Sequence, residues 1–200
     1  RSVTAARVAS DASAFPDRSA ACGYGRFSVA QSGDHFEFPD GSTYIVRSPA
    51  RDSGGDEVEM EFVLPSDCLP PPPHVHPSQV ESYEVIEGSL DVVIEGEWVT
   101  LGPGESASVP VGASHTFRNS SGTLVRVRNW HRPAMQFEDF IEEMCVNMEK
   151  AGIRTKYDPR TLIYMSMAMI DYPETLRPSR KRELRPMRLM ARAGRFLRMG

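Results

Sequence analysis

Residues 42–130 consist of short runs of strand length that alternate with turn-forming residues, and this pattern constrains the fold more than any other feature of the sequence. Turn signals rich in Gly, Ser and Pro separate the runs at 53–55, 87–89, 95–97, 102–104 and 120–122. Within 57–64, apolar residues alternate with glutamates, as expected of a strand with one buried face. The predicted strands span residues 42–47, 57–64, 80–86, 89–95, 97–101, 105–110, 114–119 and 123–130. So many short strands at hairpin spacing predict a β-sandwich or β-barrel.

After Arg132 the sequence changes to helical periodicity. Pro133 is followed by the segment 134–152, in which apolar residues recur at helical spacing and Gly152 suits the C-terminal stop. Two more apolar segments with helical spacing follow at 159–171 and 179–198. We therefore predict three parts, which are an N-terminal arm with the first strands at 1–40, a β-barrel at 41–132 and a helical extension at 133–200.

The cysteines limit the class of protein. The chain of 200 residues has three cysteines, Cys22, Cys68 and Cys145, without a CxxC pair. This usage indicates neither a disulfide framework nor a cysteine zinc site. One cysteine must stay unpaired, which favours a reducing compartment, and we expect a cytoplasmic location. The longest apolar run is far shorter than the ~20 residues of a membrane-spanning helix.

The formal net charge of −4 combines an acidic body with a basic tail. Residues 177–200 carry nine basic groups and one acidic group, which leaves residues 1–176 with a net charge of −12. The acidic body disfavours nucleic acid as a partner. We expect the basic tail to pack on an acidic surface of this chain or of a second copy rather than to contact a membrane. We also expect Arg126 and Arg128, on one face of the last predicted strand, to be solvated and paired with acidic groups.

Three of the five histidines and one glutamate indicate a metal site. His74 and His76 are two residues apart, so on a strand both side chains point to the same face. Glu81 follows at an odd spacing, which requires a bend after Pro77 to return its side chain to the same interior. His115 lies in a second segment. Three neutral imidazoles and one carboxylate suit a divalent first-row metal, with positions left open for substrate or water.

These two segments resemble the two motifs of the cupin superfamily. The first motif, G-x5-HxH-x3–4-E-x6-G, is matched by His74, His76, Glu81 and Gly88, with Cys68 in place of its opening glycine. The second motif, G-x5-PxG-x2-H-x3-N, is matched in full by Gly104, Pro110, Gly112, His115 and Asn119. The resemblance extends over residues 42–130 and implies a mainly β cupin fold, a double-stranded β-helix (jelly-roll) barrel with a metal near one mouth. Residues 131–144 resemble the tail of small bacterial-type cupins, which implies a C-terminal α-helical extension.

The resemblance also implies a function. It makes His74, His76, Glu81 and His115 the ligands of one divalent transition metal, which is Fe, Mn, Ni, Cu or Zn. Our first hypothesis is a metal-dependent dioxygenase, similar to the quercetinase-type enzymes, that acts on a small molecule with an enol or phenol oxygen. In this hypothesis Glu81 takes the proton of the substrate. Tyr83 shares the strand parity of Glu81 and is predicted to point inward, where its hydroxyl orients a substrate or packs in the core.

Two other functions remain open at this point. One is a metal-bearing module that binds or senses a small molecule without turnover, and the other is a metal-assisted isomerase or lyase. In the family that the chain resembles, edge strands pair across subunits, so we expect a homodimer. We predict that Phe62 and Phe117 line the cavity, and that His35 and His131 are surface or hinge residues.

Overall fold

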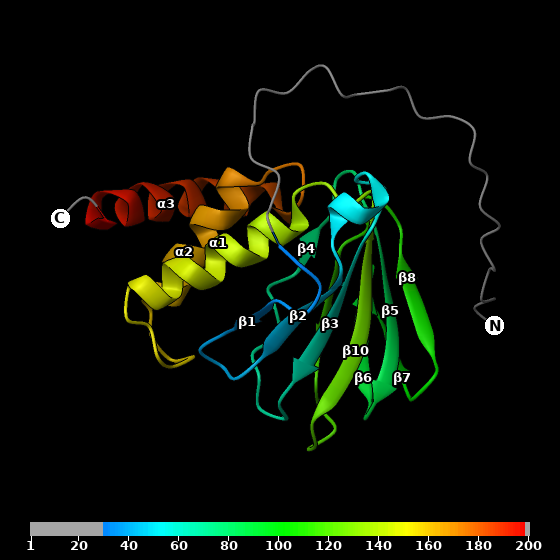
Figure 1. Ribbon diagram of the computed structural model, residues 1–200. Helices are drawn as coiled ribbons and strands as arrows, with labels where there is room; N and C mark the ends of the chain where they lie inside the picture. Colours follow the sequence, from blue (N-terminus) through cyan, green and yellow to red (C-terminus); the bar gives the residue numbers. More distant parts are fainter. Residues whose placement is uncertain (1–29, 199–200) are drawn as a thin grey trace.

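The computed structural model describes residues 30–198, which form two antiparallel β-sheets with helices packed at one end (Figure 1). Residues 1–29, which include most of the predicted N-terminal arm, lie outside the described residues. The first sheet has the strand order β1 (His35–Glu37), β2 (Thr43–Ser48), β3 (Val58–Leu64), β10 (Val125–Arg132), β5 (Val80–Glu87) and β8 (Ser106–Val109). The second has the order β11 (Arg177–Pro178), β4 (His74–Val75), β9 (His115–Arg118), β6 (Leu90–Ile94) and β7 (Glu97–Leu101).

Each of the eight predicted runs contains a strand, so the mainly β prediction is confirmed. Strands β1, β4 and β11 have no counterpart in the prediction, because two or three residues are too few to show an alternating pattern. Strand β4 pairs His74 with His115 on β9 and with Pro178 on β11. A segment beyond the first two helices thus completes the sheet that carries two of the predicted ligands.

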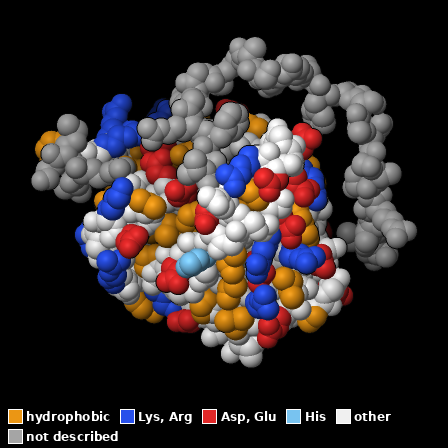
Figure 2. Space-filling model, viewed as in Figure 1, with side chains coloured by type: hydrophobic (Ala, Val, Ile, Leu, Met, Phe, Trp, Pro, Cys, Tyr) orange, Lys and Arg blue, Asp and Glu red, His pale blue; other side chains and the backbone are white. Residues whose placement is uncertain are grey.

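Strand β3 shows how the sheet separates core from surface. Its apolar side chains at alternate positions are buried, as predicted, and they are Val58, Met60, Phe62 and Leu64. On the other face, the Glu61 carboxylate accepts hydrogen bonds from Arg47 Nε at 2.8 Å and Arg126 Nε at 2.7 Å. Arg128 Nε lies 3.6 Å from Glu59 Oε1, which confirms that this face of β10 is paired with acidic groups. Figure 2 shows the basic and acidic side chains interleaved on this side of the molecule.

The three predicted helical segments form α1 (Phe137–Lys150), α2 (Arg160–Asp171) and α3 (Leu184–Arg198). Helix α3 begins five residues later than predicted, because β11 and a 3₁₀ turn (Lys181–Glu183) occupy the preceding residues. Helix α2 contacts both α1 and α3. Within the described part of the chain, no helix is both long and apolar enough to cross a lipid bilayer.

Glu138 links the start of α1 to the 3₁₀ turn at Ala50–Ser53 by a hydrogen bond. Its ionisation leads to a prediction on how the stability of the protein depends on pH. Its carboxylate accepts the Ala50 N–H at 3.2 Å, and burial raises its pKa to about 7. Between the ordinary carboxyl pKa and this value the folded chain binds a proton that the unfolded chain has lost, so stability falls as the pH rises. From about pH 5 to about pH 8 we expect the parent to lose about 1 kcal/mol more of its unfolding free energy than Glu138→Gln, after allowance for solvent screening. Urea unfolding of both proteins at the two pH values measures this, and equal losses would contradict it.

Candidate metal centre

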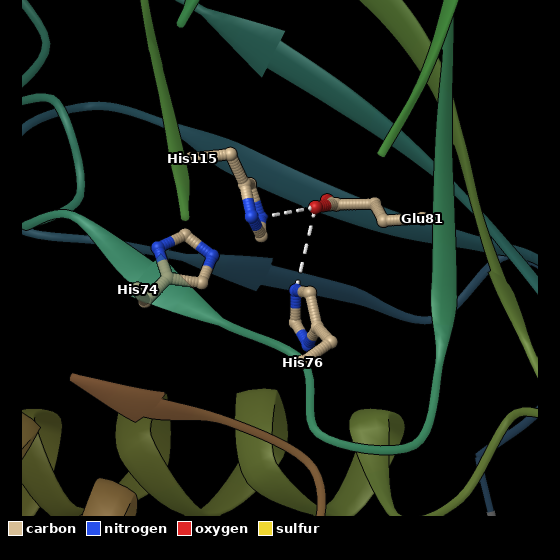
Figure 3. A group of neighbouring side chains, drawn as sticks. All are labelled: His74, His76, Glu81 and His115. Atoms are coloured by element: carbon tan, nitrogen blue, oxygen red, sulfur yellow. Dashed lines mark ion pairs between the residues drawn. The ribbon is translucent and has the colours of Figure 1, made fainter. Parts of the chain in front are cut away.

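Four side chains from three strands and one loop converge at the helical end of the sheets (Figure 3). His74 lies on β4 and His76 directly after it, Glu81 lies on β5, and His115 lies on β9. All four are buried, and one potential ligand atom of each lies within 4.8 Å of the others. Glu81 Oε2 is 3.3 Å from His76 Nε2 and 2.7 Å from His115 Nε2. The structure therefore brings together the whole predicted ligand set.

Backbone carbonyls fix the orientation of each imidazole. His74 Nδ1 donates to the Pro72 carbonyl at 3.0 Å, and His115 Nδ1 donates to the Ala113 carbonyl at 3.0 Å. His76 Nδ1 donates at 2.6 Å to the carbonyl of Thr175, which lies between α2 and β11. With the proton on Nδ1, each neutral ring presents the lone pair of Nε2 as a ligand.

The atoms that face one another in this cluster fit a metal ion. His76 Nε2, His115 Nε2 and Glu81 Oε2 are buried and have no hydrogen-bond partner. Because both Nδ1 atoms carry the donated proton, these three atoms are all acceptors, and acceptors in close contact require a cation or a proton between them. A divalent metal satisfies all three at once, so the residues present suit such an ion.

The electrostatics of the cluster act differently on its members. Burial, together with the neighbouring His115 and His76, lowers the pKa of His74 to about 3. Burial alone would raise the pKa of Glu81, but His115 and His131 hold it well below its usual range. Burial also acts against protonation of His115, yet the Glu81 carboxylate outweighs it and raises that pKa. At neutral pH, His74 is therefore uncharged and Glu81 is ionised.

His131 is buried in this site, so its predicted place at the surface or at a hinge is wrong. The register of β10 on β5 pairs His131 with Glu81, which directs both side chains inward. Its Nε2 lies 3.5 Å from Glu81 Oε1, and its ring stacks on Phe137 with the centroids 3.5 Å apart. Arg126 and Arg128 point outward from β10. His131 is three residues after Arg128, so alternation along the strand turns its side chain inward, and this signal could have identified it.

Asn129 is a second inner residue of β10 that the sequence reasoning did not identify. Its Nδ2 donates to Glu81 Oε1 at 2.8 Å, which orients the carboxylate so that Oε2 faces the imidazoles. His35, by contrast, is exposed as expected.

Tyr83 points inward from β5 and is fully buried. Its ring lies 5.8 Å from that of Phe117, and its hydroxyl has no hydrogen-bond partner. Burial, with the Glu81 carboxylate nearby, raises its pKa well above the usual range. The hydroxyl therefore stays protonated, and a direct role in orienting a substrate remains a prediction.

A cavity of about 70 Å³ adjoins the cluster. His74, His76 and Glu81 form part of its wall, and Phe62 and Phe117 line it as predicted. Tyr44, which the sequence reasoning did not single out, also lines it and stacks on Phe62 with the centroids 4.1 Å apart. The remaining wall comes from two prolines before β4, from the helices and from the segment after α2: Pro71, Pro72, Phe137, Phe140, Ile141, Met144, Met165, Met169 and Leu176.

Solved structures with a similar fold include a domain of a transcriptional regulator, a cyclase and a predicted decarboxylase. The Cupin_2 domain of an XRE family transcriptional regulator from Enterobacter cloacae is 24% identical with a TM-score of 0.40, over 46% of this chain and 95% of that one. The polyketide cyclase RemF from Streptomyces resistomycificus is 28% identical with a TM-score of 0.40, over 46% and 64%. A predicted oxalate decarboxylase from Thermotoga maritima is 16% identical with a TM-score of 0.45, over 53% and 99%. No curated protein sequence matches the chain.

The fold and the site together define a two-sheet β protein with a candidate metal centre beneath a helical cover. The family model of the cupin domain, Cupin_2, matches residues 60–131. This matched part of the chain contains all four candidate ligands and has the sequence signature of a cupin domain.

Proposed function

We propose that the protein is a metal-dependent oxygenase that acts on a small molecule with an enol or phenol oxygen. The observation that carries the proposal is the buried His₃Glu cluster, which has ligand atoms without hydrogen-bond partners and adjoins a cavity with an apolar wall. A bound divalent ion would supply Lewis acidity and, if redox-active, electron transfer with dioxygen. His74, His76, Glu81 and His115 would hold that ion.

The protein's own groups account for the remaining requirements. Glu81 is ionised and lines the cavity, so its carboxylate is placed to take the proton of an enol or phenol. Asn129 and the backbone carbonyls fix the ligand orientations before the substrate enters. The helices and Leu176 line the cavity with apolar side chains, and less polar surroundings strengthen electrostatic interactions near the candidate ligands.

The Glu81→Gln variant distinguishes catalysis of the proposed reaction from ligand binding without turnover. Purified protein that contains Fe, Mn, Ni or Cu by elemental analysis should consume oxygen with an enol or phenol substrate. The variant should lose at least about a hundredfold in turnover while it retains some metal, because an amide cannot accept the proton. Glu84→Gln, on the outer face of the same strand, is the matched control.

Other results of this experiment would move the function elsewhere. Full activity in Glu81→Gln would contradict the role of the base. Saturable binding of a ligand with no product under any metal or oxygen condition would favour the binding module, and zinc as the only metal would favour a lyase or isomerase. A protein without metal would contradict the metal-centred function.

Two further proposals concern location and assembly. The described cysteines, Cys68 and Cys145, are free thiols, which supports a cytoplasmic location. The edge strand β7 exposes Trp98 and Val99, which supports pairing in a homodimer.

A further inference from the structure

Apart from Tyr44 and the candidate ligands, the side chains that line the cavity are apolar. Met165 and Met169 lie one turn apart on α2, so both point to the cavity, and Met144 reaches it from α1. Met167, between them on α2, is as buried as Met169 but faces α3, where it lies against Gly194. The helical extension therefore contributes one specific face to the cavity.

Polar groups in the wall are few. Among the described residues, no Lys or Arg lines the cavity, and besides the candidate ligands Tyr44 is the lining residue whose side chain carries a polar group, its hydroxyl. Burial keeps this hydroxyl protonated by raising its pKa, so it can donate one hydrogen bond. A ligand with a second charged group, such as a phosphate ester or a dicarboxylate, would bury that charge without a partner, which strongly disfavours its binding.

The cavity is also small. Its volume of about 70 Å³ is well below the ~300 Å³ of the smaller usual ligand pockets, and an apolar cavity of ~150 Å³ is known to hold benzene. A large polycyclic substrate does not fit this volume. Because methionine side chains are flexible, the cavity can enlarge where Met144, Met165 and Met169 change rotamer.

We propose that the cavity binds a compact, apolar molecule with one oxygen-bearing head toward His74, His76 and Glu81 and no second charged group. Met144, Met165 and Met169 determine how large its apolar part can be. The position of the head rests on the proposed function, whereas the apolar fit rests on the cavity alone.

Methionine methyl groups report directly on this fit. In Zn²⁺-loaded protein labelled with [methyl-¹³C]methionine, pentane-2,4-dione should shift the resonances of Met144, Met165 and Met169 and leave those of Met148 and Met167 in place. Malonate, which has a similar length and two charges, should bind at least about tenfold more weakly. Shifts confined to other methionines, or malonate binding as tight as that of the diketone, would overturn the proposal.

Two variants on α2 test whether the methionines that line the cavity determine the size of the ligand that it binds. Met169→Ala removes a side chain that lines the cavity, and Met167→Ala removes one of equal type and burial on the opposite face. By calorimetry, Met169→Ala should shift the affinity ratio about tenfold towards 1-phenylbutane-1,3-dione over pentane-2,4-dione. Met167→Ala should leave the ratio within about twofold. Equal shifts in both variants would overturn the assignment.

Chelated protein distinguishes failure of this inference from failure of the proposed function. If the protein takes up no metal, the metal-centred function fails. If pentane-2,4-dione still shifts the three methyl resonances in the metal-free protein, the apolar pocket stands. If it shifts none of them in either form, the pocket inference fails whatever the metal content.

Discussion

We expect the His76→Ala variant to retain little bound metal. The substitution removes a buried Nε2 that lies 3.3 Å from Glu81 Oε2, together with the ring that the Thr175 carbonyl holds in place. Removing a group that only orients a ligand typically costs 10–100-fold in metal affinity, and loss of a ligand itself should exceed that. Elemental analysis after dialysis should therefore find near-stoichiometric metal in the parent and little in the variant.

His131→Leu is the matched control for this experiment. His131 is as buried as His76 and also contacts Glu81, but it lies outside the group of side chains that can share an ion. We expect its loss to weaken metal binding by about 10–100-fold at most, through the orientation of Glu81. Added metal should raise the thermal midpoint of the parent and of His131→Leu, but not that of His76→Ala. Equal metal loss in the two variants would contradict the assigned ligand set.

The C-terminal extension is part of the candidate metal centre as well as its cover. Besides the Thr175 carbonyl on His76, β11 pairs Pro178 with His74, and Ser179 N–H donates to the Pro73 carbonyl at 3.1 Å. Ser114, next to His115, donates from Oγ to Ser179 Oγ at 2.7 Å. The strand that carries His74 is only two residues long, and β9 and β11 hold it from both sides. The position of the ligands therefore depends on residues beyond the matched cupin segment.

The sequence predicted the four candidate ligands because their side chains suit a divalent metal and their spacing matches the two motifs that the chain shares with cupins. It predicted the strands because alternation of apolar and charged residues determines which face is buried, as in β3. It did not predict Thr175, because the contact uses a backbone carbonyl that any residue could supply. It placed His131 wrongly because the predicted strand ended at residue 130, whereas β10 continues to Arg132 and carries the alternation of inner and outer side chains through His131. The apolar cavity depends on how helices pack across the sheets, and no periodicity within one helix determines that.

Gly88, the last residue of the first motif, is expected to tolerate no side chain. It lies in the turn between β5 and β6 with φ of +80°, and that turn packs against the start of β10. A Cβ there would lie 2.7 Å from the Leu124 carbonyl oxygen and 3.2 Å from Val125 Cα, both of which are backbone atoms. The left-handed conformation costs about 1–2 kcal/mol for alanine, and the forced shift of packed atoms adds about 1–3 kcal/mol. Gly88→Ala should therefore lower the free energy of unfolding by about 2–5 kcal/mol.

Gly96→Ala separates the two contributions, because Gly96 has a similar φ of +87° in the turn between β6 and β7 and a Cβ there meets nothing within 4 Å. This control should cost about 1–2 kcal/mol, the conformational part alone. Urea unfolding of both variants in metal-free buffer measures the difference without a contribution from ligand binding. Equal losses would show that the turn at Gly88 can move away from β10. A larger loss in Gly88→Ala would mean that the motif requires glycine for close packing, which fixes the end of the strand that carries Glu81.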